Sequence, residues 1–221
     1  MACHGVQAVI VSVDYQCGYN VPLEVEVDDC YKAYIWAHDH AAEYGADSSR
    51  CLLWGGSAAG ALAIAVVHRL VKAGTGDEIA GLVHMNGLTC HPDATPEGYR
   101  HLNTSYGDNG GPLPFVSGND TLGLYAHRDL EPPNTDFNLF PAAGGPAHLK
   151  GFPPTYIITS DNDASRDDGT VLEAVLKDAG VRVRRDNIMG FAHYFWTFDV
   201  PQANANFWSK LCSGMKWTLE S

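Results

Sequence analysis

The feature that most constrains the fold of this chain is the alternation of short apolar runs with longer segments of helical periodicity. The short runs predict buried strands at Val6–Val13, Arg50–Trp54, Ile79–Met85, Thr155–Thr159 and Val181–Ile188. The longer segments predict helices over about 27–44, 58–74, 167–179 and 202–219. Strands that alternate with helices form right-handed βαβ units, so the sequence predicts an α/β fold with a mostly parallel sheet flanked by helices.

Length and composition limit the class of protein. The chain has 221 residues, which suits one domain over 1–221 with a sizeable buried core. Apolar residues make up 45% and charged residues 18%, as in a soluble globular protein rather than a disordered one. The formal net charge of −12 comes without any basic run, so we expect no nucleic-acid partner.

The cysteines and the N-terminal segment bear on the cellular compartment. The cysteines lie far apart without a CxxC pair, so neither a disulfide framework nor a metal site is predicted. They are Cys3, Cys17, Cys30, Cys51, Cys90 and Cys212. The segment MACHGVQAVIVSVDYQ does not resemble a signal peptide, and no apolar run is long enough to span a membrane. We therefore expect a cytoplasmic protein without a membrane span.

A long Gly- and Pro-rich stretch separates the third and fourth predicted strands. It extends from about Gly87 to Pro154, which is too long for a plain loop inside a domain. We expect it to hold short helices that shape a pocket, or to form a functional lid.

The segment WGGSAAG, at 54–60, joins the second predicted strand to the helix that follows it. A serine between strand and helix is the setting of a nucleophile elbow, whose strained backbone requires small neighbours. The small neighbours here are Gly55, Gly56 and Ala59. The helix N-terminus would also place the backbone N–H of Ala58 beside a developing oxyanion. On these residues alone, Ser57 is either a nucleophile or part of a structural turn.

A serine hydroxyl becomes a good nucleophile only when a histidine accepts its proton and a carboxylate orients that histidine. His193 follows the last predicted strand, at the end of the sheet where α/β folds place their sites. We interpret the other histidines as surface or packing residues. They are His4, His38, His40, His68, His84, His91, His101, His127 and His148.

The carboxylate is expected in TSDNDASRDDG, which follows the fourth predicted strand. Asp167 is predicted to be the N-cap of the next helix, with Asp168 part of the same helix start. Asp161 and Asp163 then remain as candidates. The segment does not fit a calcium-binding loop, because Arg166 stands where that loop requires glycine.

Several motifs of the chain resemble the hormone-sensitive-lipase-like branch of α/β-hydrolases. GGSAAG resembles the GDSAGG elbow of that family, PPTYIITSDNDASRDDG its acid motif and GFAHYF its GxxHxF motif. VSVDYQ, with Pro22 and Asp29, resembles the VDYR…P…ED segment. The resemblance covers almost the whole chain and implies an α/β-hydrolase fold. It also implies Ser57 as nucleophile, Asp163 as orienting acid and His193 as general base.

The chain departs from that family at the elbow and in its N-terminal part. Gly56 stands where the family elbow has aspartate. In the family, an HGG(G) loop after the third strand completes the oxyanion hole, whereas this chain opens with the strand that normally follows. We expect the first three strands and the cap helices to be missing, with the Ala58 N–H as remaining oxyanion donor. His4-Gly5 is interpreted as a helix end. Without the third strand, Val6–Val13 either pairs directly with Arg50–Trp54 or leaves an exposed apolar edge, which favours association between copies.

The resemblance implies a serine hydrolase that cleaves carboxylic esters of small or medium acyl groups through an acyl-enzyme. Its partner is then a small-molecule ester, and no cofactor or metal is implied. Two alternatives stay open. The chain is a truncated, catalytically impaired or ligand-binding member of the family, or it catalyses a non-hydrolytic cyclisation or elimination of a natural-product ester.

Overall fold

Four of the predicted strands form one parallel sheet. The computed structural model describes residues 6–18, 20–108 and 136–220. Within these ranges the strands pair in the order β1-β2-β3-β4, all parallel. Their bounds are Leu52–Gly56 for β1, Gly81–Met85 for β2, Thr155–Ser160 for β3 and Val183–Ile188 for β4. Because all four run in one direction, their carboxyl ends lie along one side of the sheet.

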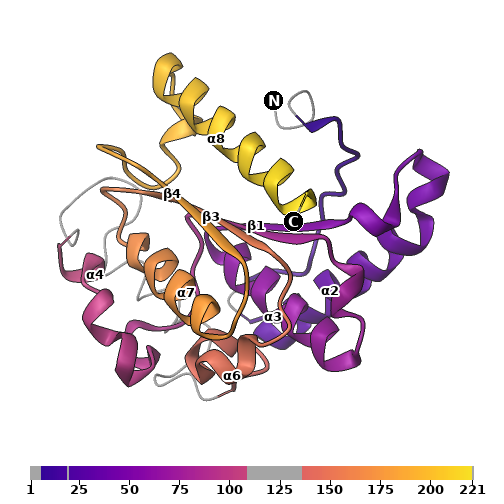
Figure 1. Cartoon of the computed structure of the whole chain (residues 1–221), viewed down its shortest axis with the longest axis horizontal. Helices are drawn as coiled ribbons and strands as arrows, with labels where there is room; N and C mark the ends of the chain where they lie inside the picture. Colours follow the sequence, from indigo (N-terminus) through magenta and orange to yellow (C-terminus); the bar gives the residue numbers. More distant parts are fainter. Residues whose placement is uncertain (1–5, 19, 109–135, 221) are drawn as a thin grey trace.

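Helices cover both faces of this sheet (Figure 1). One long helix, α8, lies on one face, while α3 and α7 lie on the other and α2 packs outside α3. The bounds are Leu23–His40 for α2, Ala58–Ala73 for α3, Ser105–Asp108 for α4, Pro146–Leu149 for α6, Arg166–Asp178 for α7 and Pro201–Leu219 for α8. Short 3₁₀ turns occur at Ala41–Tyr44, Ser48–Arg50, Gly76–Glu78, Pro92–Ala94, Glu97–Leu102, Pro141–Gly144 and Phe195–Thr197. None of the helices in the described ranges is long and apolar enough to cross a membrane. The predicted α/β architecture is confirmed.

The first predicted strand is wrong. Val6–Val13 contains no strand and joins no ladder in the described part of the chain. Its central side chains are about half exposed, at 49% for Val9, 49% for Ile10 and 47% for Val11. A run of β-branched residues becomes a strand only where the backbone of a neighbour completes its hydrogen bonds. No described strand provides that partner here.

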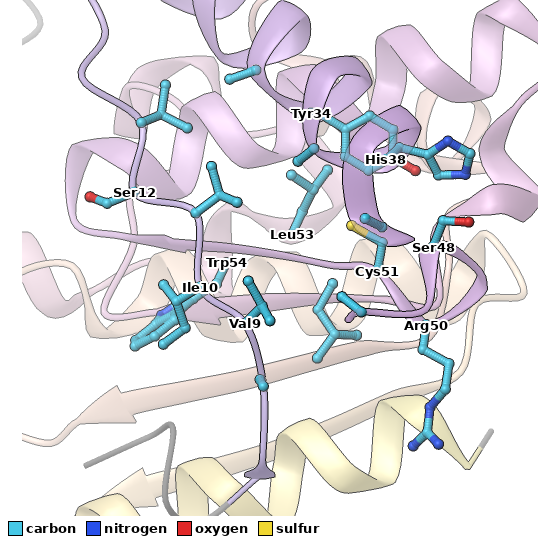
Figure 2. A pocket seen from close by; sticks show the side chains of 18 of the residues that line it. Val9, Ile10, Ser12, Tyr34, His38, Ser48, Arg50, Cys51, Leu53 and Trp54 are labelled. Carbon is cyan, nitrogen blue, oxygen red and sulfur yellow. The ribbon is translucent and has the colours of Figure 1, made fainter. Parts of the chain in front are cut away.

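A groove separates this segment from the open edge of β1, as Figure 2 shows. Its cavity volume is about 1020 Å³, and Val6–Val13 lines one side while Leu52, Leu53 and Trp54 of β1 line the other. Residues of α2 and α3, of the segment 41–51 and of the end of α8 also line it. Of the two arrangements expected for this region, the structure has the exposed apolar edge rather than direct pairing. We call this cavity the edge groove.

A buried histidine lies beneath the start of α3. His84 on β2 is fully buried, and its Nε2 lies 3.3 Å from the backbone oxygen of Leu88. An added Cβ would lie 2.9 Å from this Nε2 at Gly60 and 2.5 Å from it at Gly87. Both positions therefore need glycine, because the imidazole fills the space beside them. The Nδ1 atom of His84 has no hydrogen-bond partner among the described residues, so the ring is better accommodated in its neutral form.

His84 and His68 make folding stability sensitive to acid. Burial lowers the pKa of His84 to about 4, and burial together with the nearby charges of Lys72 and His148 lowers the pKa of His68 to about 4. In an unfolded chain both titrate near pH 6.5, so the unfolded state binds more protons as the pH falls below that value. The free energy of unfolding should therefore decrease between pH 6.5 and 4, by about 2–3 kcal/mol per histidine.

Asp168 acts in the opposite direction, because burial raises its pKa to about 6 and the folded state binds its proton first. Urea unfolding at pH 7.5 and 5.0 measures the sum of these contributions. We expect His84→Gln, which cannot titrate, to lose less stability than the wild type between the two pH values. Equal losses in both proteins would show that His84 does not contribute.

Candidate active site

Ser57 lies on the tight turn between β1 and α3. Its backbone has φ 52° and ψ −127°, a strained conformation for a residue with a side chain. The backbone N–H of Ser57 donates to the Met85 oxygen on β2, and the N–H of Leu88 donates to the Ser57 oxygen. An added Cβ at Gly55 would collide with the backbone oxygen of Ala59. The turn thus requires the small residues that the sequence provides around the serine.

Ser57, His193 and Asp163 lie in one hydrogen-bonded line. The Nε2 atom of His193 is 3.0 Å from Ser57 Oγ, and its Nδ1 atom is 2.7 Å from Asp163 Oδ2. The His193 side chain is 10% exposed and that of Asp163 is fully buried. With Nδ1 protonated toward the carboxylate, Nε2 is free to accept the serine proton. The structure therefore brings together the three residues that the motifs indicate. Ser57 and His193 are 136 positions apart in the sequence, and Asp163 and His193 are 30 positions apart.

The surroundings of Asp163 favour its ionised form. Burial raises the pKa of this carboxyl, but hydrogen bonds and the charge of His193 lower it more, so the net pKa lies below the usual range. The side chain of Asn86 donates to Oδ2, and the backbone N–H and hydroxyl of Ser165 each donate to Oδ1 at 2.9 Å. A carboxylate with several donors stays charged and fixed in orientation. Asp163 is thus suited to hold the imidazole of His193.

Asn86 and Ser165 were not predicted from the sequence. Asn86 directly follows β2, at the same end of the sheet as the residues above. Its position in the sequence could have indicated a role in the site, because a polar residue directly after a parallel strand lies where α/β folds place their sites. Ser165 lies two residues after Asp163 and bonds to it locally, as short hydroxyl side chains often do.

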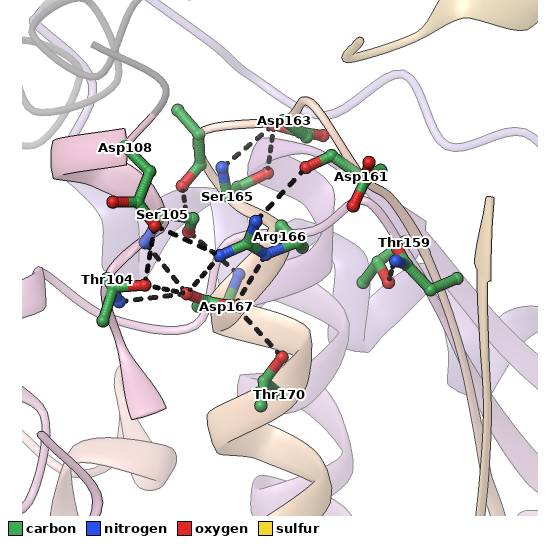
Figure 3. Close-up of polar contacts among 12 residues, drawn as sticks. Thr104, Ser105, Asp108, Thr159, Asp161, Asp163, Ser165, Arg166, Asp167 and Thr170 are labelled. Carbon is green, nitrogen blue, oxygen red and sulfur yellow. Dashed lines mark hydrogen bonds and ion pairs between the residues drawn. The ribbon is translucent and has the colours of Figure 1, made fainter. Parts of the chain in front are cut away.

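Asp167 does not act as the N-cap of α7, contrary to the prediction. The N-cap is Ser165, and Asp167 lies in the first turn of the helix. Its carboxylate accepts the backbone N–H groups of Thr104 at 2.9 Å and Ser105 at 2.8 Å, and pairs with the guanidinium of Arg166 (Figure 3). Burial alone would raise the pKa of Asp167, but these partners lower it below its usual range. Asp167 therefore connects the start of α4, at Thr104 and Ser105, to the first turn of α7.

Asp168 belongs to the start of α7, as predicted, and its carboxylate also accepts hydrogen bonds from residues far away in the sequence. It accepts the backbone N–H of Thr89 at 2.8 Å, the Thr89 hydroxyl at 2.7 Å and the Tyr106 hydroxyl at 2.6 Å. Although burial raises its pKa, these three donors hold the charged form in place. The described part of the Gly87–Pro154 stretch is thus fastened to α7 by two neighbouring carboxylates.

Among the residues that the structure describes, the other acidic and histidine residues considered from the sequence do not take part in the hydrogen bonds between Ser57, His193 and Asp163. Asp161 does not contact His193; its backbone oxygen accepts from Arg166 at 3.4 Å. His68, His84 and His91 are buried packing residues, rather than surface ones. His4, Gly5 and His127 lie outside the described residues, as does the part of the expected lid over 109–135.

The backbone N–H of Ala58 is the candidate oxyanion donor that the described chain offers beside Ser57. Ala58 is the first residue of α3, where helix N–H groups have no partner within the helix and the helix dipole favours negative charge. The residues that line the edge groove do not include Ser57, Asp163 or His193, but they do include Ala59. The groove thus begins beside the elbow and extends away from it along β1.

The chain matches a known protein family and is similar to a known esterase. Residues 1–197 match the Abhydrolase_3 family, described as an alpha/beta hydrolase fold. The versiconal hemiacetal acetate esterase of Dothistroma septosporum is 33% identical over 214 residues, covering 96% of this chain and 64% of that protein. The chain therefore spans less than two thirds of that relative.

Two solved structures share the fold closely. The thermostable carboxylesterase EstE1, cloned from a metagenomic library, superimposes with a TM-score of 0.85 at 23% identity, covering 99% of this chain and 71% of that one. Vibralactone cyclase superimposes with a TM-score of 0.83 at 25% identity, covering 99% of this chain and 64% of that one.

Proposed function

Because the chain belongs to the Abhydrolase_3 family of α/β hydrolases, we propose that it is a serine hydrolase of carboxylic esters with small or medium acyl groups. The observation that carries this proposal is the hydrogen-bonded line from Ser57 through His193 to Asp163. The 33% identical relative is named as an esterase, and this supports the proposal that the substrate is an ester. The family predicted from the motifs is confirmed by the match.

The proposed reaction proceeds through an acyl-enzyme. His193 Nε2 accepts the hydroxyl proton of Ser57 while Oγ attacks the ester carbonyl carbon. Asp163 stabilises the imidazolium that forms, and Nε2–H then donates the proton to the departing alcohol oxygen. Water, deprotonated by His193 in turn, attacks the acyl carbon, so that the carboxylic acid leaves and Ser57 regains its proton.

Oxyanion stabilisation sets the expected rate. The N–H of Ala58 can donate one hydrogen bond to the tetrahedral intermediate. Loss of one oxyanion donor typically lowers kcat by about 10²–10³-fold, so we propose that the Ala58 N–H contributes to catalysis on that scale. A ligand-binding member with little catalysis is the corresponding alternative, but the intact contact between Ser57 and His193 favours chemistry over binding alone.

A non-hydrolytic reaction is the second candidate, favoured by the similarity to vibralactone cyclase. A cyclase transfers the acyl group to an internal nucleophile of the substrate, so no solvent oxygen enters the product. Hydrolysis incorporates one water oxygen into the released acid. Mass spectrometry of products formed in H₂¹⁸O therefore separates the two reactions.

The testing experiment is turnover of p-nitrophenyl acetate and butyrate by the purified protein, together with labelling by a fluorophosphonate probe. We expect measurable turnover and labelling of one serine, located by mass spectrometry in the peptide that contains Ser57. Labelling without turnover would favour the impaired alternative. Absence of both would contradict the proposed function.

We further propose that two copies associate through the edge groove. The open edge of β1 and the half-exposed Val6–Val13 segment belong to the same chain, so a two-fold arrangement can cover both in each copy. Ile10→Lys places a charge at the centre of this apolar segment, at a position that is 49% exposed and contributes little to the core.

Ile10→Lys is expected to weaken association at least about tenfold, as a central interface substitution does, in sedimentation-velocity experiments over a concentration series. Met189→Lys is the matched control, because Met189 is 67% exposed and directly follows β4 at the opposite edge of the sheet. A wild type that stays monomeric throughout the series would contradict the proposal, as would equal effects of the two substitutions.

A further inference from the structure

Tyr194 has a backbone conformation that a tyrosine rarely adopts. Its φ is 54° and its ψ is 28°, in the left-handed region that favours glycine. Residues with large side chains persist there only when their surroundings hold them, and such outliers concentrate at functional sites. Tyr194 directly follows His193, so the strain lies in the loop that carries the proposed general base.

The side chain of Tyr194 reaches the elbow that carries Ser57. A Cβ added at Gly56 would lie 2.7 Å from the Tyr194 hydroxyl oxygen and 2.8 Å from Met85 Cε, which is closer than real Cβ atoms come to their neighbours. Gly56 directly precedes Ser57. The centre of the Tyr194 ring also lies 4.8 Å from the centre of the His193 imidazole. One side chain therefore packs against both the base and the turn of the nucleophile.

The aromatic residues that follow Tyr194 pack in another direction. Phe195 and Trp196 are 4% and 9% exposed and belong to the core beneath α8. Trp196 stacks on Phe207 of α8, with ring centres 4.1 Å apart and planes at 9°. These two residues anchor the loop to the core. Tyr194, which is only partly buried, extends instead to Gly56.

We infer that Tyr194 is a positioning residue, which holds the His193 loop at the correct separation from Ser57. The inference rests on the proposed function. Contact of the hydroxyl with Gly56 limits how closely the two loops approach, and contact of the ring limits rotation of the imidazole. Together they maintain the 3.0 Å distance between His193 Nε2 and Ser57 Oγ.

Gly56 is the complement of Tyr194 in this arrangement. The elbow that this sequence resembles has aspartate at the position of Gly56, and a side chain there would occupy the place of the hydroxyl. Burial, and then the charges of Tyr15 and Asp163, raise the pKa of Tyr194. The hydroxyl therefore stays neutral at working pH and does not compete with His193 for the serine proton.

The test is a double-mutant cycle between Tyr194→Phe and Gly56→Ala, read as kcat and KM for p-nitrophenyl butyrate and as the rate of fluorophosphonate labelling. Gly56→Ala alone is expected to lower kcat about 10²-fold, because a displacement of about 1 Å in a reacting group has that effect. The same substitution in Tyr194→Phe should lower kcat less, because the hydroxyl is gone and the remaining close side-chain contact, 2.8 Å to Met85 Cε, is with the end of a flexible side chain. KM should stay within about twofold throughout, because positioning of the base affects reaction rather than binding.

Two further variants make the outcome unambiguous. Glycine adopts the left-handed backbone without strain, so Tyr194→Gly is expected to remain folded and to lower kcat with KM unchanged. Tyr99→Phe removes a hydroxyl that bonds Asp178, at the far end of α7 from Asp163, and should have no effect. Additive effects of Tyr194→Phe and Gly56→Ala, or full activity of Tyr194→Gly, would overturn the inference while leaving the proposed function intact. A wild type that neither turns over the ester nor reacts with the probe would overturn both.

Discussion

Replacing Ser57 by alanine is expected to remove ester turnover down to the rate of the buffer, a decrease of about 10⁴–10⁶-fold. The substitution deletes the atom that forms the acyl-enzyme. The fold should tolerate it, because alanine is small enough for the turn and the backbone bonds of Ser57 to β2 and Leu88 do not involve its side chain. Steady-state turnover of p-nitrophenyl butyrate measures the effect.

Ser213→Ala is the control for this experiment. Ser213 is an exposed serine of α8 that contacts Arg184 at 3.2 Å, away from the elbow. It should keep full turnover and full labelling by the fluorophosphonate. Residual turnover by Ser57→Ala equal to that of the wild type would mean that any observed hydrolysis arises elsewhere on the protein, and the nucleophile would be wrongly assigned.

The second large effect is expected for Asp163→Asn, which should lower kcat about 10⁴-fold at neutral pH, the size seen when the acid of such a triad becomes an amide. The amide keeps the shape of the side chain but can donate to His193 Nδ1. It then favours the ring form with a proton on Nε2, which cannot accept the hydroxyl proton of Ser57. The amide also loses the negative charge that stabilises the imidazolium.

Asp161→Asn is the matched control, because it makes the same chemical change two residues earlier in the same loop. Asp161 makes no contact with His193 in the structure, so its variant should retain kcat within a few-fold. Circular dichroism and urea midpoints should show both variants folded. A large loss for Asp161→Asn, with little for Asp163→Asn, would reassign the acid.

The residues of the site differ in how far the sequence could predict them. Ser57 and His193 each lie in the loop after a predicted strand, and in a parallel sheet the ends of the strands already place such residues close together. Asp161 and Asp163 both follow β3, so local pattern alone left two candidates. Only the family motif favoured Asp163, and the structure brings that carboxylate to the imidazole.

Contacts over long sequence separations account for what the sequence did not predict. Asn86 supports Asp163 across 77 residues, and no local pattern encodes that bond. Asp167 looked like a helix cap because caps are read from neighbouring residues, whereas its partners Thr104 and Ser105 lie more than sixty positions away. Val6–Val13 has the composition of a strand, but pairing depends on a second strand that the run itself cannot specify.

The sheet gives the site one polar residue after each of its strands: Ser57 after β1, Asn86 after β2, Asp163 after β3 and His193 after β4. The site therefore exists only when every pairing in the sheet has formed. Parallel pairings close long loops and form slowly, so they belong to the late steps of folding. Recovery of the proposed esterase activity after dilution from denaturant should thus report the last of these pairings, and a partly folded chain is expected to show no turnover however much helix it has regained.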